Sequence, residues 1–320
     1  MNHFDVFNGD ADGICALIQL RLANPVDSQL ITGVKRDIKL LSQVVAAVGD
    51  KVTVLDVSMD KNKPALESLL AQGVEVFYCD HHASGDIPDS THLDALINLE
   101  PDVCTSLLVN GRLNGAHALW AIVGAFGDNL KQSALAVARP LSLDAVTLDK
   151  LEKLGIYINY NGYGAAIEDL HFAPEALYNA MVQCVSPLDF MAGDNPVFEA
   201  LEAGYVADMA KVDSLEPMTA FDHAAVYQLP NQKWARRVSG VFSNDLANAN
   251  PDRAHAVLTE LDGGDFLVSV RAPLNNKQGA VDICSQFDTG GGRAAAAGIN
   301  RLPADEVVRF IDVFAAYYRE

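Results

Sequence analysis

Short apolar runs alternate with amphipathic stretches through the first half of the chain. The runs 4–7, 52–55 and 74–79 consist mainly of β-branched, aromatic and leucine residues and predict buried strands. A shorter run at 30–33 predicts another strand. Apolar side chains recur at helical spacing between these runs, and we expect helices at 12–23, 39–48, 63–72 and 115–126, with much of 130–190 helical as well. This alternation is typical of a parallel sheet covered on both faces. We therefore expect an α/β fold with an N-terminal doubly wound parallel sheet.

The pattern changes after residue 220, where a second, smaller α/β domain is expected. Strands are predicted at 224–229, 238–242, 254–261 and 266–271. A glycine run at 290–292 is expected to open an alanine-rich helix, and 304–318 to form a final amphipathic helix. The amphipathic stretch 195–213 lies between two prolines and is interpreted as a connector. We expect one domain over 1–190, a helical linker over 191–219 and the second domain over 220–320.

Composition indicates a globular protein, because half of the 320 residues are hydrophobic and only 20% are charged. The longest apolar run, 118–126, is too short for a membrane span and predicts a buried helix. Asp5, Asp10 and Asp12 occupy the region where a signal peptide carries basic and then apolar residues. The five cysteines are scattered without CxxC spacing, and Cys79 is expected to be a buried small hydrophobe. We expect a cytoplasmic protein that does not associate with membranes.

The formal net charge of −19 argues against binding of long nucleic acids, which requires clustered lysines and arginines. A small anionic substrate is compatible with this charge if metal ions and a few basic groups create a local positive pocket. The composition therefore favours a small-molecule substrate.

Four acidic and histidine clusters lie in the first 130 residues, and three of them directly follow a predicted strand. Parallel strands bring their carboxyl ends to one crevice of an open sheet. Carboxylates and imidazoles gathered there require a neutralising cation, and oxygen-rich sites with one or two imidazoles suit Mn²⁺ or Mg²⁺. The pattern predicts a two-metal hydrolase site. The clusters are Asn8-Gly9-Asp10-Ala11-Asp12-Gly13, Asp56-Val57-Ser58, Asp80-His81-His82 and Gly127-Asp128.

Taken singly, most of these residues have a structural explanation as well. Asp10 and Asp12 are typical of a capped turn that starts a helix, and Asp56 of the N-cap of the following helix. Asp128 is typical of a turn at the end of a helix. Asn8 either supplies a carbonyl ligand or caps the turn. A calcium EF-hand is excluded because the required ligand spacing is missing.

The Asp80-His81-His82 cluster is the most specific of the four. Two adjacent histidines at a strand end cannot both point into a core, so at least one meets solvent or a ligand. A histidine that ligates a metal presents one neutral nitrogen, while a neighbouring carboxylate usually holds the other. We expect His81 to ligate, and His82 to face the substrate phosphate as a donor or proton shuttle.

In this order, the four clusters resemble the motifs of the DHH phosphoesterase family. The later run Gly290-Gly291-Gly292-Arg293, followed by alanines and preceded by Ser269-Val270-Arg271, resembles the DHHA1 domain found in one subfamily. The resemblance covers nearly the whole chain. It implies a metal-dependent phosphohydrolase that works in the cleft between a DHH domain and a DHHA1 domain.

The resemblance also implies roles for individual residues. Asp10 and Asp56 would hold a first Mn²⁺, and Asp12, Asp56, His81 and Asp128 a second, with Asp56 bridging and Mg²⁺ as the alternative metal. His82 would stabilise the charge that develops in the reaction, and Asp80 would orient the site. Substrate binding falls to the second domain, on residues Arg271, Gly290, Gly291, Gly292 and Arg293, with backbone N–H groups at a helix start facing an anion.

Two positions depart from the family pattern. Val6 stands where many relatives carry a histidine, so the first ion lacks an expected ligand, and Asn8 or water would replace it. Arg293 stands where histidine is usual, and its planar fork of donors favours a substrate rich in phosphate. Lys35 and Arg36 either add to the same pocket or form a solvated turn, and the turn is the favoured interpretation.

These features lead to the hypothesis of an Mn²⁺-dependent phosphohydrolase of small nucleotides, with guanosine tetraphosphate-type alarmones as the favoured substrate. Short oligonucleotides, linear dinucleotides and 3′-phosphoadenosine 5′-phosphate are the alternative within the same chemistry. A nucleotide sensor without turnover is the alternative from another class. The final helix serves as core or interface, with core favoured, and the sequence leaves the oligomeric state open, a homodimer included.

Overall fold

The computed structural model describes residues 1–319 and divides into two compact units, Met1–Ala203 and the residues from Gly204 onward. The division falls within helix α9 (Pro196–Met209), inside the segment 191–219 predicted as a linker. All the acidic and histidine clusters belong to the first unit, and the glycine run and its arginines belong to the second.

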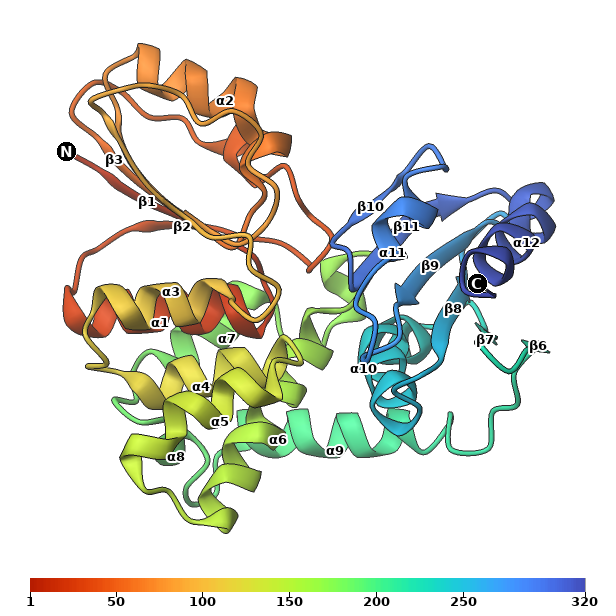
Figure 1. The fold of residues 1–320 in the computed structure, drawn as a ribbon. Helices are drawn as coiled ribbons and strands as arrows, with labels where there is room; N and C mark the ends of the chain where they lie inside the picture. The colour runs from red at the N-terminus through yellow and green to blue at the C-terminus, as the bar shows by residue number, and fades with distance from the viewer. Residues whose placement is uncertain (320) are drawn as a thin grey trace. The chain divides into compact units, whose positions relative to one another are not determined.

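A five-stranded parallel sheet forms the centre of the first unit, in the order β2-β1-β3-β4-β5. Helix α2 (Met59–Ala71) covers one face, and α1 (Ala11–Ala23) and α3 (Thr105–Arg112) cover the other (Figure 1). This confirms the predicted doubly wound parallel sheet. The strands are β1 (His3–Phe7), β2 (Gln29–Ile31), β3 (Lys51–Leu55), β4 (Glu75–Asp80) and β5 (Leu93–Ile97).

The strand order reverses at β1. The chain goes from β1 to β2 on one side and then returns to place β3 on the other side. In open α/β sheets, the crevice at such a reversal lies at the carboxyl ends of the strands and is the usual ligand site. The residues that directly follow β1 and β3 are therefore at the position where ligands bind.

Further helices pack beneath α1 and α3 (Figure 1). They are α4 (Ala118–Gly127), α5 (Lys131–Ala138), α6 (Ala145–Gly162), α7 (Pro174–Met181) and α8 (Pro187–Phe190), with 3₁₀ turns at Leu40–Gln43, Arg139–Leu141 and Ile167–Asp169. Helix α4 is almost wholly buried, as its apolar sequence predicts.

Two glycines allow α1, α4 and α6 to approach closely. A Cβ added to Gly127 would lie 2.3 Å from the Ala11 Cβ and 2.8 Å from the Gly155 carbonyl oxygen. A Cβ added to Gly155 would lie 2.3 Å from the Val123 carbonyl oxygen. Because Asp128 directly follows Gly127, this packing also fixes the position of a site residue.

The second unit has a six-stranded mixed sheet in the order β10-β11-β9-β8-β7-β6. Helix α10 (Lys233–Ala249) packs on this sheet, while Phe310 and Phe314 of α12 (Val307–Tyr317) join an apolar core with the strands and with α11 (Ala280–Cys284). A 3₁₀ turn at Ala304–Glu306 precedes α12. The strands are β6 (Thr219–Ala220), β7 (Ala224–Leu229), β8 (Ala254–Glu260), β9 (Phe266–Arg271), β10 (Gly290–Gly292) and β11 (Ala296–Leu302).

The helix predicted after the glycine run is wrong, because Gly290–Gly292 forms β10 and pairs antiparallel with β11. A Cβ on Gly290 would lie only 1.7 Å from the Cys284 carbonyl oxygen, and Gly292 has φ +140°. The glycines therefore serve a close backbone approach and a tight hairpin. Most of the small alanines fit into β11 and the hairpin turn against β9.

Three other predicted elements also differ from the structure. The predicted strand 238–242 lies inside α10, because Val238, Val241 and Phe242 also fit the spacing of one buried helical face. The segment 39–48 forms only a short 3₁₀ turn, and α2 begins at Met59 rather than at residue 63. No helix within residues 1–319 is long and apolar enough to cross a bilayer.

Candidate metal centre

Asp10 and Asp12 lie at the start of α1, directly after β1. Asp10 caps the helix, since its Oδ1 accepts hydrogen bonds from the Asp12 and Gly13 N–H groups at 3.0 and 3.1 Å. The Asp12 carboxylate accepts from the Thr105 and Ser106 N–H groups at the start of α3, both at 2.7 Å. A helix start stabilises negative charge, and these two hydrogen bonds hold the Asp12 carboxylate in one orientation.

Asp56 follows β3 with a left-handed backbone, φ +59°. It does not cap the next helix, because Ser58 occupies the N-cap position of α2. Its Oδ1 accepts a hydrogen bond from the Thr105 hydroxyl at 3.3 Å. Burial raises the pKa of Asp56 well above its usual value, and the neighbouring Asp10 and Asp12 carboxylates raise it further. A cation is the natural partner for a carboxylate in these surroundings.

His81 is oriented as a metal ligand. Its Nδ1 lies 2.8 Å from the Val103 carbonyl oxygen, which only accepts, so Nδ1 carries the hydrogen. The other nitrogen, Nε2, lies 3.2 Å from Asp56 Oδ1 and 3.8 Å from Asp12 Oδ2. In the neutral imidazole, Nε2 directs a lone pair towards two carboxylates, which is favourable only with a cation between them.

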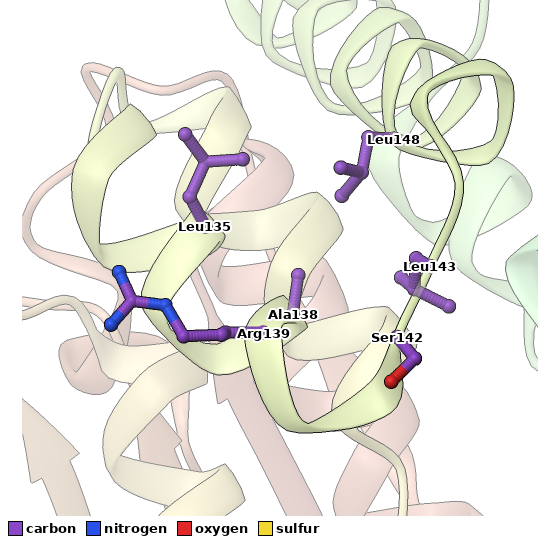
Figure 2. Close-up of a pocket in the computed structure, with 6 residues that line it drawn as sticks. All are labelled: Leu135, Ala138, Arg139, Ser142, Leu143 and Leu148. Carbon is purple, nitrogen blue, oxygen red and sulfur yellow. The ribbon is translucent and has the colours of Figure 1, made fainter.

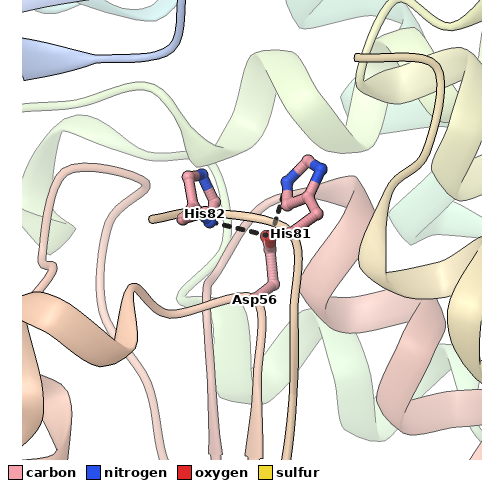
Figure 3. A group of neighbouring side chains, drawn as sticks. All are labelled: Asp56, His81 and His82. Atoms are coloured by element: carbon pink, nitrogen blue, oxygen red, sulfur yellow. Dashed lines mark ion pairs between the residues drawn. The ribbon is translucent and has the colours of Figure 1, made fainter. Parts of the chain in front are cut away.

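His82 and Asp80 form a second pair next to Asp56. The His82 Nδ1 lies 2.8 Å from Asp80 Oδ1 and 3.8 Å from Asp56 Oδ1. Its other ring nitrogen points away from Asp56 (Figure 3). Burial raises the pKa of Asp80, but His82 outweighs burial and holds that pKa below its usual value. Asp80 is therefore an ionised group that orients His82.

Lys35 is the unexpected member of the cluster. Its ammonium forms an ion pair with Asp10 and lies 3.9 Å from Asp128 Oδ1. Burial raises the pKa of Asp10, but Lys35 outweighs burial and lowers it. The solvated turn favoured from sequence is thus wrong for Lys35. Arg36, next in the chain, is half-buried.

Asn8 lies between β1 and Asp10. Its side-chain amide donates to the Lys35 carbonyl oxygen at 3.1 Å, while its buried Oδ1 has no hydrogen-bond partner within residues 1–319. Asn8 therefore holds the Lys35 backbone, and its orphaned oxygen is a candidate ligand atom.

The donor atoms around His81 fit a divalent cation. Adjacent ligands of an octahedral ion with bonds of about 2.1 Å are about 3 Å apart. Asp56, His81 and His82 each offer an atom within 4.8 Å of the others, and the Asp56 to His81 separation matches the octahedral value. An ion in this place would be held by Asp56 and His81, and Asp12 Oδ2 lies 3.8 Å from the His81 Nε2. Such mixed oxygen and nitrogen donors suit Mn²⁺ or Mg²⁺.

The second unit holds the other predicted substrate residues. Arg271 ends β9, and its Nε donates to Asn244 Oδ1 at 2.7 Å. Ala296 pairs with Arg271 across the sheet, and the Arg293 N–H donates to the Ala296 carbonyl oxygen at 2.8 Å. Both arginines thus belong to the same end of the sheet. Because no helix begins at the glycine run, the anion site predicted on helix N–H groups is wrong.

Sequence reasoning missed three contributors: the N–H pair at the start of α3, the Val103 carbonyl, and Asn159 of α6, whose Oδ1 accepts a hydrogen bond from the Lys35 ammonium at 3.0 Å. The Thr105-Ser106 pair is a signal for a helix start that could have revealed the first. Nothing local marks Val103 or Asn159.

A surface pocket of about 360 Å³ lies elsewhere in the first unit, around α5 and the start of α6 (Figure 2). Its lining contains one charged residue, Arg139, and no acidic or histidine side chain. The pocket therefore lacks the carboxylates and imidazoles that the candidate metal centre requires.

No protein-family model and no curated protein matches the sequence. Among solved structures, the chain is similar to exonuclease RecJ bound to manganese, with TM-score 0.59, 18% identity, and coverage of 99% of this chain and 90% of that one. RecJ from Thermus thermophilus in complex with Mn²⁺ gives TM-score 0.55, 20% identity and 99% coverage, and this chain spans 52% of its length. The pGpG-specific phosphodiesterase PggH from Vibrio cholerae gives TM-score 0.50, 10% identity, and coverage of 98% and 99%. At these identities the likeness shows the fold, which is the α/β fold predicted from the motifs.

Proposed function

We propose that this protein is a divalent-metal-dependent phosphohydrolase of small nucleotides. The observation that carries the proposal is the orientation of His81, whose Nδ1 is held by a backbone carbonyl while Nε2 faces Asp56 at 3.2 Å and Asp12 at 3.8 Å. The resemblance of the motifs to DHH phosphoesterases, and the fold shared with an exonuclease and a dinucleotide phosphodiesterase, support the same chemistry.

The chain's own residues have separable tasks in this proposal. When bound, a divalent ion lowers the pKa of a coordinated water and neutralises charge on phosphate oxygens. Asp12, Asp56 and His81 hold the ion, with α3 and Val103 fixing two of them. His82, held by Asp80, presents its second nitrogen to the phosphate and donates a hydrogen bond as negative charge develops there.

Linear dinucleotides and similarly short nucleotides are the first substrate class that we propose. The net charge of −19 opposes the binding of a long polyanion, whereas a short one needs only a local positive site. Arg271 and Arg293 supply two guanidinium groups for its phosphates. RecJ is named an exonuclease and PggH a pGpG-specific phosphodiesterase, so phosphodiester cleavage is the reaction that this fold accompanies in both.

A guanosine tetraphosphate-type alarmone is the second candidate, cleaved at a pyrophosphate group. It is favoured by Arg293, which replaces the histidine usual in the resembling motif and contributes a permanent charge with bidentate geometry.

The test is incubation of the purified protein with Mn²⁺ or Mg²⁺ and a nucleotide panel, with products resolved by chromatography. The panel contains a linear dinucleotide, guanosine tetraphosphate, 3′-phosphoadenosine 5′-phosphate and a labelled five-mer. We expect mononucleotides from the dinucleotide, and no product after Asp56→Asn substitution. Pyrophosphate from the tetraphosphate, with the dinucleotide intact, would favour the second candidate.

A nucleotide sensor is the alternative that this experiment also addresses. Tight binding of a panel nucleotide, without any metal-dependent product, would refute the hydrolase and favour the sensor. If a panel nucleotide is hydrolysed, Arg271→Ala and Arg293→Ala separate substrate binding from chemistry, because we expect each to raise KM more than it lowers kcat.

A further inference from the structure

Lys35 reaches the carboxylate expected to hold the first of two metal ions. Its Nζ forms an ion pair with Asp10 Oδ2, lies 3.0 Å from Asn159 Oδ1 and 3.9 Å from Asp128 Oδ1. It also lies 5.3 Å from the centre of the Tyr163 ring, within range of a cation–π contact. The Lys35 ammonium thus lies among three side-chain oxygens that can accept hydrogen bonds, at a place where a metal ion is expected.

The backbone holds Lys35 in this position. Its N–H donates to the Gly162 carbonyl oxygen at 2.9 Å, and its carbonyl accepts from the Asn8 amide at 3.1 Å. Only 22% of the side chain is exposed. The ammonium is therefore held in place by the backbone contacts of Lys35 and by its ion pair with Asp10.

Both carboxylate oxygens of Asp10 already have partners. Oδ1 accepts from two N–H groups at the start of α1, and Oδ2 pairs with Lys35. Val6, which stands where many DHH relatives carry a histidine ligand, is completely buried in the apolar core on the α2 side of the sheet. The first ion thus lacks the histidine ligand that Val6 replaces. The charge of its other expected ligand, the Asp10 carboxylate, is already neutralised by Lys35.

We infer that the Lys35 ammonium replaces one of the two divalent ions, so that the site binds a single ion at Asp12, Asp56 and His81. The inference rests on the proposed function and specifies which groups supply the positive charge of the phosphohydrolase site. Lysine contributes one unit of charge rather than two, and its N–H groups offer a donor to a phosphate oxygen without coordinating water. The ion would then supply the hydroxide, and the lysine would help to neutralise the charge of the phosphate.

The test counts bound Mn²⁺ per chain in the full-length protein, by calorimetric titration and by the electron paramagnetic resonance signal of free and bound Mn²⁺. The wild type is expected to bind one ion. Lys35→Met keeps the aliphatic stem and removes the charge, so Asp10 becomes free to ligate, and we expect two ions with an exchange-coupled spectrum. Lys35→Arg, which keeps the charge, should bind one ion, as should the control Lys39→Ala on the exposed loop.

Two ions in the wild type, or one ion in both the wild type and Lys35→Met, would overturn the inference. Circular dichroism of each variant establishes that its fold is retained. The nucleotide panel, applied to the same samples, separates this result from the proposed function. A wild type that binds two ions and hydrolyses a nucleotide refutes only the role of Lys35. One that binds a single ion and hydrolyses nothing refutes only the hydrolase, and one that binds no ion refutes both.

Discussion

Substitution of Asp56 by asparagine should have opposite effects on stability with and without metal. Asparagine keeps the size of the side chain and tolerates the left-handed backbone at φ +59°, so the fold is retained. The substitution removes a buried charge near Asp12. Asp56 Oδ1 and Asp12 Oδ2 lie 3.2 and 3.8 Å from the His81 Nε2, so these two oxygens are at most about 7 Å apart.

The repulsion of two unit charges at that distance is about 2 kcal/mol for an effective dielectric constant of 20. Without metal, Asp56→Asn should therefore raise the midpoint of unfolding of the first unit by about 4–8 °C. This gain should grow as the pH rises. The folded-state pKa of Asp56 is raised, so the wild type loses stability as the pH rises through that pKa, whereas the variant does not.

With metal the order reverses. A ligand present at 100 times its Kd stabilises the folded state by about 2.7 kcal/mol, which corresponds to about 5–11 °C for a unit of this size. The wild type should show this shift with Mn²⁺, and Asp56→Asn should lose most of it. The assay is calorimetric unfolding with chelator and with Mn²⁺, with the exposed Asp86→Asn as the matched control. An equal Mn²⁺-induced shift in Asp56→Asn and the wild type would show that Asp56 is not a ligand.

Three further outcomes are expected. His82→Ala should lower kcat/KM by about 10²–10⁴-fold and leave the Mn²⁺-induced stabilisation intact, and loss of both together would make His82 a ligand instead. Phe310→Ala should cost the second unit about 3–5 kcal/mol, measured by denaturant unfolding, while Mn²⁺ binding stays unchanged because the proposed ligands belong to the first unit. Burial, with a smaller effect of Arg253, lowers the pKa of His255 from 6.5 to about 4, so the unfolded chain binds a proton across that range and the folded chain does not. The wild type should lose up to about 3 kcal/mol as the pH falls from 6.5 to 4, and His255→Leu should flatten this dependence; equal acid sensitivity in both would contradict the assignment.

The convergence of residues at the candidate metal centre was largely predictable because these residues follow strands. Strands β1, β3 and β4 are each rich in apolar residues, and parallel strands place the next residues at one edge of the sheet. Asp10, Asp56 and His81 therefore converge without any need to know how the helices pack. The roles of these residues as ligands stay predictions.

The part that was not predictable depends on contacts distant in sequence. Lys35 follows a three-residue strand, β2, and its charge acquires a role only through Asp10, 25 positions away, and Asn159, 124 positions away. Edge strand β5 is half-exposed and lacks a clear alternation. The glycine run gives the same local pattern before a helix and in a hairpin, and only its contact with Cys284 decides between them.

The close packing at Gly127 and Gly155 also has a consequence for the choice among cations. Helices α1, α4 and α6 already meet at the limit of backbone contact beside Asp128, so the wall of the site next to them is held rigidly. Thr105 ties Asp56 to the start of α3, which also binds Asp12, so these two carboxylates cannot easily spread apart. Ca²⁺ requires ligand distances of about 2.3–2.6 Å and six to eight oxygens, whereas Mg²⁺ is satisfied by six at about 2.0–2.1 Å. We therefore expect this frame to resist the expansion that Ca²⁺ requires, and Ca²⁺ should compete poorly for this site even where it is abundant.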